Sequence, residues 1–228
     1  MNAQYLEDVA VAQTLRSASP SLDAQRVTAP DRAAHAGIPG GPSHWLDSYP
    51  KHLSQTWTLG PGQSLRVRPV RHDDGELEEA FVCALSRESR YQRMLSGGVK
   101  VTPEWIDSMT HIDYRRHMAF AVTTTNNGAE QFIGVGRYMV DASESSADVA
   151  IVLADAWQRQ GLGRRLLETL IEHAASAGIR EAVGVVLTTN VAMLRLARSL
   201  GFTVRPEPGD ATVRRISRQL ATVSAQQH

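Results

Sequence analysis

The sequence predicts an α/β (α+β) domain with a mixed central sheet flanked by helices, because strand-like and helix-like segments alternate along most of the chain. The clearest strand is the apolar run from Val149 to Leu153, whose branched residues suit a buried strand. A turn that contains Gly161 and Gly163 joins this strand to an amphipathic helix. The apolar face of that helix is formed by Leu162, Leu166, Leu170 and Ala174.

The segments before this central strand predict a hairpin, three short helices and a second pair of strands. The hairpin joins residues 56–59 to residues 64–70 through a turn at Gly60, Pro61 and Gly62. The helices are expected over residues 73–85, 88–96 and 102–110, and the strands over residues 117–125 and 130–140.

The segments after the central helix predict two more strands and one more helix. Residues 181–187 form an apolar run that suits a strand. A second amphipathic helix follows it, and Gly201 is well placed to end that helix. Residues 212–220 predict the last strand.

Composition divides the chain into three regions. Residues 1–44 are rich in Ala, Ser, Pro and Gly and predict a flexible or partly helical N-terminal extension, with a helix considered over residues 4–15. Residues 45–220 contain the predicted sheet domain, and residues 221–228 form a C-terminal tail. A chain of 228 residues is expected to hold one such domain with an extension rather than two domains.

Charge and cysteine content exclude several classes of function. The 24 basic and 24 acidic residues cancel, so we expect no general binding to nucleic acid or to an anionic membrane. No apolar run has the length of a membrane span, and the acidic N-terminus does not resemble a signal peptide, so we expect a cytoplasmic protein. The single cysteine, Cys83, is expected at the edge of the core. His111, His117 and His173 lack metal-ligand spacing, so we expect no metal.

The turn between the central strand and its helix predicts a site for a diphosphate. Its glycines let the backbone approach a ligand, and the free N–H groups and dipole of the helix N-terminus favour an anion. A dinucleotide-binding fold is disfavoured because Leu166 stands where the third glycine of that fingerprint belongs. A Walker-type phosphate loop is disfavoured because no Gly-Lys-Ser/Thr follows.

The same residues resemble the GCN5-related N-acetyltransferase (GNAT) family. One family signature is Gln or Arg, two residues, Gly, one residue, then Gly or Ala, and it stands here as residues 158–163. A second signature, an Asn followed by a helix that ends in Gly-Phe, stands here as Asn190 and Gly201-Phe202. Residues 45–220 look most similar to the acetyltransferase domain of bacterial protein lysine acetyltransferases.

This resemblance implies a GNAT-type acyl-CoA-binding fold, in which the central strand and the next strand separate to admit the pantetheine arm of acetyl-CoA. Backbone groups of the central strand and of the turn are then expected to bind this co-substrate. Asn190 would bind it too, or would cap its helix instead. The implied cofactor-binding residues are Ile151, Val152, Leu153, Gln158, Arg159, Gln160, Gly161, Leu162, Gly163, Arg164 and Asn190.

The resemblance also implies the catalytic residue. Related lysine acetyltransferases have a glutamate base at the start of the central strand, and the matching residue here is Asp148. The alternative is an exposed carboxylate at a strand end. Many relatives have a Tyr on the second-signature helix that protonates the leaving thiolate, but this chain has Ala197 there, which leaves Tyr138 as a substitute.

Together these features predict an N-acetyltransferase that passes the acetyl group of acetyl-CoA directly to a primary amine in a ternary complex. The resemblance implies a protein lysine as acceptor, and a small-molecule amine is the alternative within the same class. A non-catalytic acyl-CoA-binding sensor is the alternative from another class, favoured by the shortened base and the missing Tyr. A homo-oligomer stays open.

Overall fold

The computed structural model describes residues 49–60, 62–95 and 100–221, and eight of its strands form one sheet. The strands are β1 (Gln55–Leu59), β2 (Gln63–Pro69), β3 (His117–Asn126), β4 (Ala129–Val140), β5 (Ser146–Leu153), β6 (Glu181–Leu187), β7 (Thr203–Glu207) and β8 (Asp210–Gln219). Their order across the sheet is β1-β2-β3-β4-β5-β6-β8-β7. Only the β5–β6 pair is parallel, so the sheet is mixed, as predicted.

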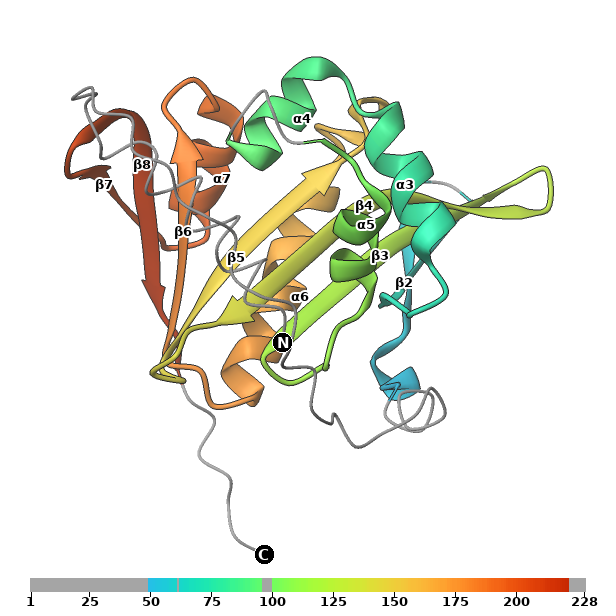
Figure 1. Ribbon diagram of the computed structural model, residues 1–228, viewed down its shortest axis with the longest axis horizontal. Coiled ribbons are helices and arrows are strands. Elements are labelled where there is room, and N and C mark those ends of the chain that lie inside the picture. Colours follow the sequence, from blue (N-terminus) through green and yellow to red (C-terminus); the bar gives the residue numbers. More distant parts are fainter. Residues whose placement is uncertain (1–48, 61, 96–99, 222–228) are drawn as a thin grey trace, which may run out of the picture.

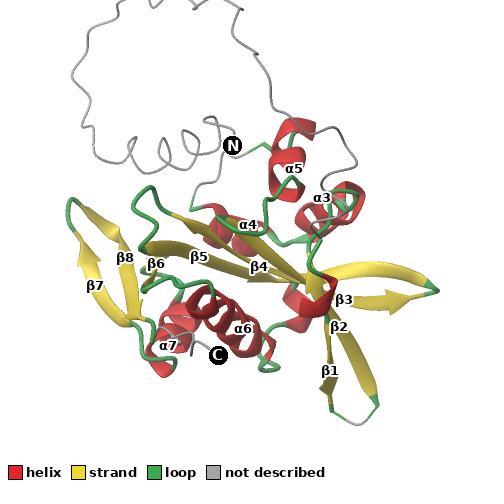
Figure 2. Ribbon diagram, turned by 90° about the horizontal axis from the view of Figure 1, so that it is seen from below, coloured by secondary structure: helices red, strands yellow, loops and turns green. Residues whose placement is uncertain are grey.

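Helices cover both faces of this sheet. They are η1 (Lys51–Leu53), α3 (Gly75–Ala84), α4 (Arg87–Met94), α5 (Pro103–Thr110), η2 (Asp155–Trp157), α6 (Leu162–Ser176) and α7 (Val191–Ser199). Figure 2 shows α3, α4 and α5 on one face and α6 and α7 on the other. This layering confirms the predicted fold class. No helix within the described residues is long and apolar enough to cross a membrane.

The helix α6 anchors the larger half of the core. Its leucines at positions 162, 166, 167 and 170 are fully buried against β3, β4 and β5. A glycine in β4 allows this close packing, because a Cβ atom added to Gly136 would lie 2.8 Å from Cδ1 of Leu170 and 2.9 Å from Cγ of Leu166. Any larger residue at Gly136 would push α6 away from the sheet.

Most of the predicted elements are confirmed. The hairpin, the three short helices, the strands before the centre, the central strand and both amphipathic helices lie where the sequence patterns place them. Pro103 occupies the first turn of α5, which Thr102 caps. Gly201 follows α7 with a φ of +79°, as expected for a residue that ends a helix. The helix considered over residues 4–15 lies outside the described residues.

One strand was missed and one expectation was wrong. The strand β7 was not predicted, because its five residues include Pro206 and do not alternate clearly. It forms at the sheet edge by pairing with β8, a position where proline is tolerated. Cys83 is exposed on α3 rather than at the edge of the core, since the buried side of that helix is formed by Phe81 and Val82.

A buried arginine joins the first half of the sheet to the start of α3. Arg68 on β2 has no exposed surface and donates two hydrogen bonds to Asp74, at 2.6 and 2.8 Å. Its Nε atom donates to Glu130 on β4 at 2.9 Å. These carboxylates raise the pKa of Arg68 against the effect of burial, so the group stays charged. Asp74 precedes α3 but uses its carboxylate for this pair instead of capping the helix.

Replacing Arg68 with methionine should strongly destabilise the protein. Arg68→Met leaves the carboxylate of Asp74 buried without its cation, and breaking a buried ion pair costs about 3–5 kcal/mol. Arg66→Met is the matched control, because Arg66 lies on the same strand but is exposed. Urea unfolding of both variants measures the difference. Equal free energies of unfolding would show that the Arg68 cluster does not contribute to stability.

Candidate active site

The strands β5 and β6 separate after only three paired positions. Ser146, Ala147 and Asp148 pair with residues 181–183, and no pairing between these strands follows. On its other side β5 stays paired with β4 as far as Leu153, while β6 stays paired with β8 to its end. The two strands therefore diverge, as Figure 1 shows, and we call the opening beyond Asp148 and Val183 the fork.

A glycine lies beside the point where the fork begins. A Cβ atom added to Gly184 would lie 3.0 Å from the backbone oxygen of Val149, which is too close for most side chains. The backbone of β5 from Val149 onward has no strand partner on the β6 side. Those of its polar groups that point away from β4 therefore face the fork, where water or a ligand must satisfy them. Ile151, Val152 and Leu153, predicted to bind the cofactor, lie on this edge.

The turn after β5 brings a row of free N–H groups to the wide end of the fork. Arg159 and Gly161 both have positive φ angles, of +60° and +82°, and Gly161 directly precedes α6. Within the described part of the chain, the backbone N–H groups of residues 159–164 have no acceptor. This row includes the first turn of α6, where the helix dipole favours an anion. These N–H groups are an arrangement that fits the diphosphate of CoA, and the diphosphate site at this turn stays a prediction.

Gln158 differs from its neighbours in the turn. Its side chain donates to the backbone oxygen of Leu153 at 3.1 Å and to Ser89 at 3.0 Å, and its N–H donates to Asp155 at 3.3 Å. The carboxylate of Asp155 accepts from Ser86 and Ser89 at the start of α4. Gln158 thus links the end of β5 to α4, and its N–H is the least available of those predicted to bind the cofactor.

Asp148 is the last residue of β5 that pairs with β6, so it lies where the fork begins. Its side chain is exposed. Desolvation by the surrounding protein nevertheless raises the pKa of Asp148 from 3.8 to about 6, although the positive charges of Arg93 and Arg215 act to lower it. These properties are compatible in an open cleft, where water reaches one side of a group and protein fills the other. A carboxylate with this pKa can accept a proton near neutral pH.

The face of the sheet that carries Asp148 is the one covered by α3, α4 and α5. Residues Ala147 and Val149 belong to the core on the α6 side, so Asp148 between them points the other way. Arg137 on β4 lies on the Asp148 face as well, where it is buried and donates to Glu78 at 2.9 Å. Burial raises the pKa of Glu78 while Arg137 lowers it. This ion pair fixes α3 to the sheet beside the site.

Asn190 caps α7. Its side-chain oxygen accepts a hydrogen bond from the N–H of Met193 at 3.0 Å, which is one of the two roles considered for it. The amide nitrogen of the same side chain is not used by that bond. The capping bond therefore leaves the amide nitrogen of Asn190 available as a donor.

Tyr138 is excluded as a substitute acid. It is fully buried on the α6 side of the sheet, opposite to Asp148, and its hydroxyl lies 2.8 Å from Nδ1 of His173. Burial raises the pKa of Tyr138 and lowers that of His173. Ala197, at the position where many relatives have Tyr, is buried in α7. The structure thus places neither residue where it could protonate a leaving group in the fork.

The other histidines have structural surroundings. His111 is exposed and pairs with Asp107 at 2.7 Å. His117 lies beside Arg137, and burial together with that cation lowers its pKa to about 3. Among the residues that the structure describes, no three His, Cys, Asp or Glu side chains are grouped to hold a metal.

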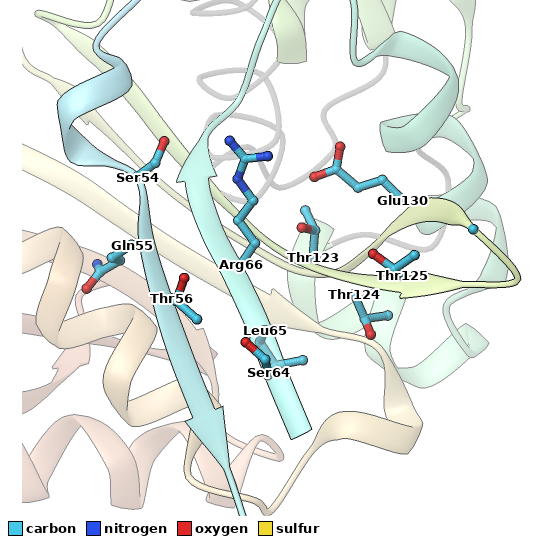
Figure 3. Close-up of a pocket in the computed structure, with 11 residues that line it drawn as sticks. Ser54, Gln55, Thr56, Ser64, Leu65, Arg66, Thr123, Thr124, Thr125 and Glu130 are labelled. Atoms are coloured by element: carbon cyan, nitrogen blue, oxygen red, sulfur yellow. The ribbon is translucent and has the colours of Figure 1, made fainter. Parts of the chain in front are cut away.

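A second opening in the sheet is separate from the fork. The strands β2 and β3 pair only from Arg66 to Pro69, and beyond that point the two hairpins diverge around a polar groove of about 640 Å³. Figure 3 shows threonine and serine side chains and Glu130 along this groove. Glu130 is already bound to Arg68, which lowers its pKa, so this carboxylate is a poor base.

Sequence reasoning did not identify the arginines near Asp148. Arg93 lies on α4 and Arg215 on β8, so 55 or more residues separate each from Asp148 along the chain. Arg93 falls in a helix that is polar on most sides, and Arg215 falls in a strand with several other arginines. Neither pattern indicates which residue faces the site, because that depends on the packing of α4 for Arg93 and on strand register for Arg215.

Comparisons with known proteins agree with this geometry. A family model described as an acetyltransferase (GNAT) domain matches residues 64–203. An acetyltransferase of Pseudomonas aeruginosa is 31% identical over 180 residues, which make up 79% of this chain and 90% of that protein. Acetyltransferase Pat of Mycolicibacterium smegmatis is 28% identical over 141 residues, 61% of this chain, but the match spans only 41% of that longer protein.

A solved structure, the GNAT domain of S. lividans PAT, is also similar to this chain. It has a TM-score of 0.67 and 29% sequence identity, over 75% of this chain and 99% of that domain. The chain therefore belongs to the GNAT family and is an acetyl-CoA-dependent acyltransferase.

Proposed function

We propose that this acetyltransferase acts on the side-chain amine of a protein lysine, by direct transfer in a ternary complex. The observation that carries the proposal is the position of Asp148, a solvent-accessible carboxylate with a raised pKa at the start of the fork. The resemblance of residues 45–220 to bacterial protein lysine acetyltransferases supports a protein as acceptor. The similarity to the GNAT domain of S. lividans PAT and to Acetyltransferase Pat supports the acetyltransferase domain itself. The expected location is the cytoplasm.

The co-substrate would lie in the fork. Backbone groups of Ile151, Val152 and Leu153 would pair with the amides of pantetheine, as a partial extra strand would. One of these N–H groups would face the thioester oxygen, where negative charge develops in the transition state. The free N–H groups of residues 159–164 would hold the diphosphate. The amide nitrogen of Asn190 would donate to the pantetheine end.

The acceptor requires a base because an ammonium group has no lone pair. With a pKa of about 10.4, only about one lysine in 2,500 is deprotonated at pH 7. The carboxylate of Asp148 would take the proton, directly or through a water molecule, as the amine nitrogen forms its bond to the acetyl carbon. The carbon–sulfur bond breaks and its electron pair leaves with sulfur. A thiol of pKa about 8.5 leaves readily as thiolate, so the absence of a tyrosine at Ala197 is tolerable.

Gly161→Asp should prevent acetyl-CoA binding without unfolding the protein. The substitution places a negative charge where the N–H groups are expected to hold the diphosphate. Gly178→Asp is a matched control at the other end of α6. Both glycines have a positive φ and no atom within 4 Å of an added Cβ, so the backbone strain is similar. Calorimetric titration with acetyl-CoA measures the effect. Equal affinity in both variants would place the diphosphate elsewhere.

Asp148→Asn should slow acetyl transfer to a lysine peptide by about 10²- to 10⁴-fold at pH 7, because the amide cannot accept a proton. Acetyl-CoA affinity should hardly change. The wild-type rate should fall as the pH drops through about 6, where Asp148 becomes protonated. The defect of the variant should shrink toward pH 10, where free lysine amine becomes plentiful.

Asp148→Glu, which has the reach of the family's glutamate, is the rescue variant and should keep activity. Rates measured from pH 6 to 10 with a lysine peptide and with small amines also compare the two acceptor classes. Turnover of the small amines alone would contradict a protein acceptor. A loss of rate that does not vary with pH would remove Asp148 from proton transfer. No turnover of any amine by the wild type would favour a binding protein without turnover.

A further inference from the structure

Two arginines lie directly opposite each other at the sheet edge. Arg205 on β7 pairs with Arg215 on β8, so their side chains leave the same face of the sheet side by side. Both are exposed, and within residues 49–60, 62–95 and 100–221 neither forms an ion pair or a side-chain hydrogen bond. Like charges in this position destabilise a sheet. The pair is therefore unfavourable for folding unless an anion binds it.

The register places these arginines on the same face as Asp148. Asp148 pairs with Val183, and Val183 pairs with Ser217, so these three residues share one face. Arg215 is two residues from Ser217 along β8 and so lies on that face too. The intervening Ile216 packs in the core on the α6 and α7 side, which confirms the alternation.

The distance between the base and the arginines suits one acceptor molecule. Asp148, Val183 and Ser217 form one row across β5, β6 and β8, which at about 4.8 Å per strand spacing puts Asp148 about 10 Å from Ser217. Arg215 lies two residues along β8 from Ser217, and Arg205 lies one strand farther out. Val183 and Val185 of β6 face the space between β5 and β8. The charge of Arg215 already acts on Asp148, since it lowers the pKa of that carboxyl, and Arg93 acts on it from α4.

We propose that Arg215 and Arg205 form an anion subsite for the acceptor, so that the preferred acceptor amine carries a carboxylate close to the reacting nitrogen. Guanidinium groups suit carboxylates because they donate paired hydrogen bonds. The carboxylate has two sources, an Asp or Glu side chain beside a target lysine or the α-carboxylate of a free amino acid. This inference rests on the proposed transferase function and names its acceptor chemistry.

The test uses acceptors that differ only in charge. Three peptides of equal length carry one central lysine flanked by Glu, Gln or Arg, and free glutamate and methionine are compared with their amides. For each, kcat/KM is measured at low and high salt with the full chain. The wild-type kcat/KM should be at least about fivefold higher for the acceptor that carries the carboxylate than for its neutral counterpart, as expected for charge-assisted hydrogen bonds. High salt should reduce this ratio.

The ratio of kcat/KM between the acidic and the neutral acceptor should fall close to one in the variants Arg215→Gln and Arg205→Gln and in their combination. Arg214→Gln is the matched control, because Arg214 lies on the same strand but faces the other way and donates to the backbone oxygen of Val213 at 2.9 Å. It should keep the wild-type preference. The melting temperature of Arg205→Gln should equal or exceed that of wild type, because a repulsion is removed.

Each result decides one question. Preference for the Glu-flanked peptide supports the subsite with a protein acceptor, while preference only among the amino acids supports the subsite but contradicts a protein lysine. Equal rates across the charge series in wild type, or a preference unaffected by the double variant, would overturn the subsite. If no acceptor is turned over, calorimetric binding of the Glu- and Gln-flanked peptides decides instead, and equal affinities would overturn the subsite.

Discussion

The divergence of β5 and β6 is the constraint on which the site depends. Three paired positions hold the strands together at Ser146 to Asp148, and beyond them each strand follows its outer partner, β4 or β8. The sheet stays continuous while it exposes one strand edge in its interior. Unpaired backbone groups need water or a ligand. A fork of this kind is thus a binding site for a chain with amide groups, because such a chain supplies the missing partners.

Polar contacts add to the core in holding the other parts of the site relative to the fork. Gln158 ties the end of β5 to Ser89, and Asp155 ties the following turn to Ser86. These bonds connect the free N–H groups before α6 with the helix α4, which carries Arg93. The cofactor side and the acceptor side of the site are therefore linked through one short hydrogen-bonded segment.

Charges are arranged differently inside the protein and on the face of the site. The buried arginines Arg68 and Arg137 each meet a carboxylate, which compensates for their loss of hydration. Near Asp148 the arrangement is reversed, because guanidinium groups gather around a single carboxylate that is partly desolvated. Groups left without partners tend to mark functional sites. In this chain the free N–H groups, Asp148 and the arginine pair all lie around the fork.

Features that depend on local pattern could be predicted from the residues alone. Helices and strands with clear periodicity, the turn at residues 158–163 and the family followed from neighbouring residues, since hydrophobic spacing and glycine conformation act over a few positions. Features that depend on contacts between distant segments could be seen only once the chain is folded. The strand β7 and the meeting of Arg205 with Arg215 follow from strand register, where a shift of one residue would send each side chain to the opposite face. The bonds of the Gln158 side chain depend instead on the packing of α4 beside the end of β5.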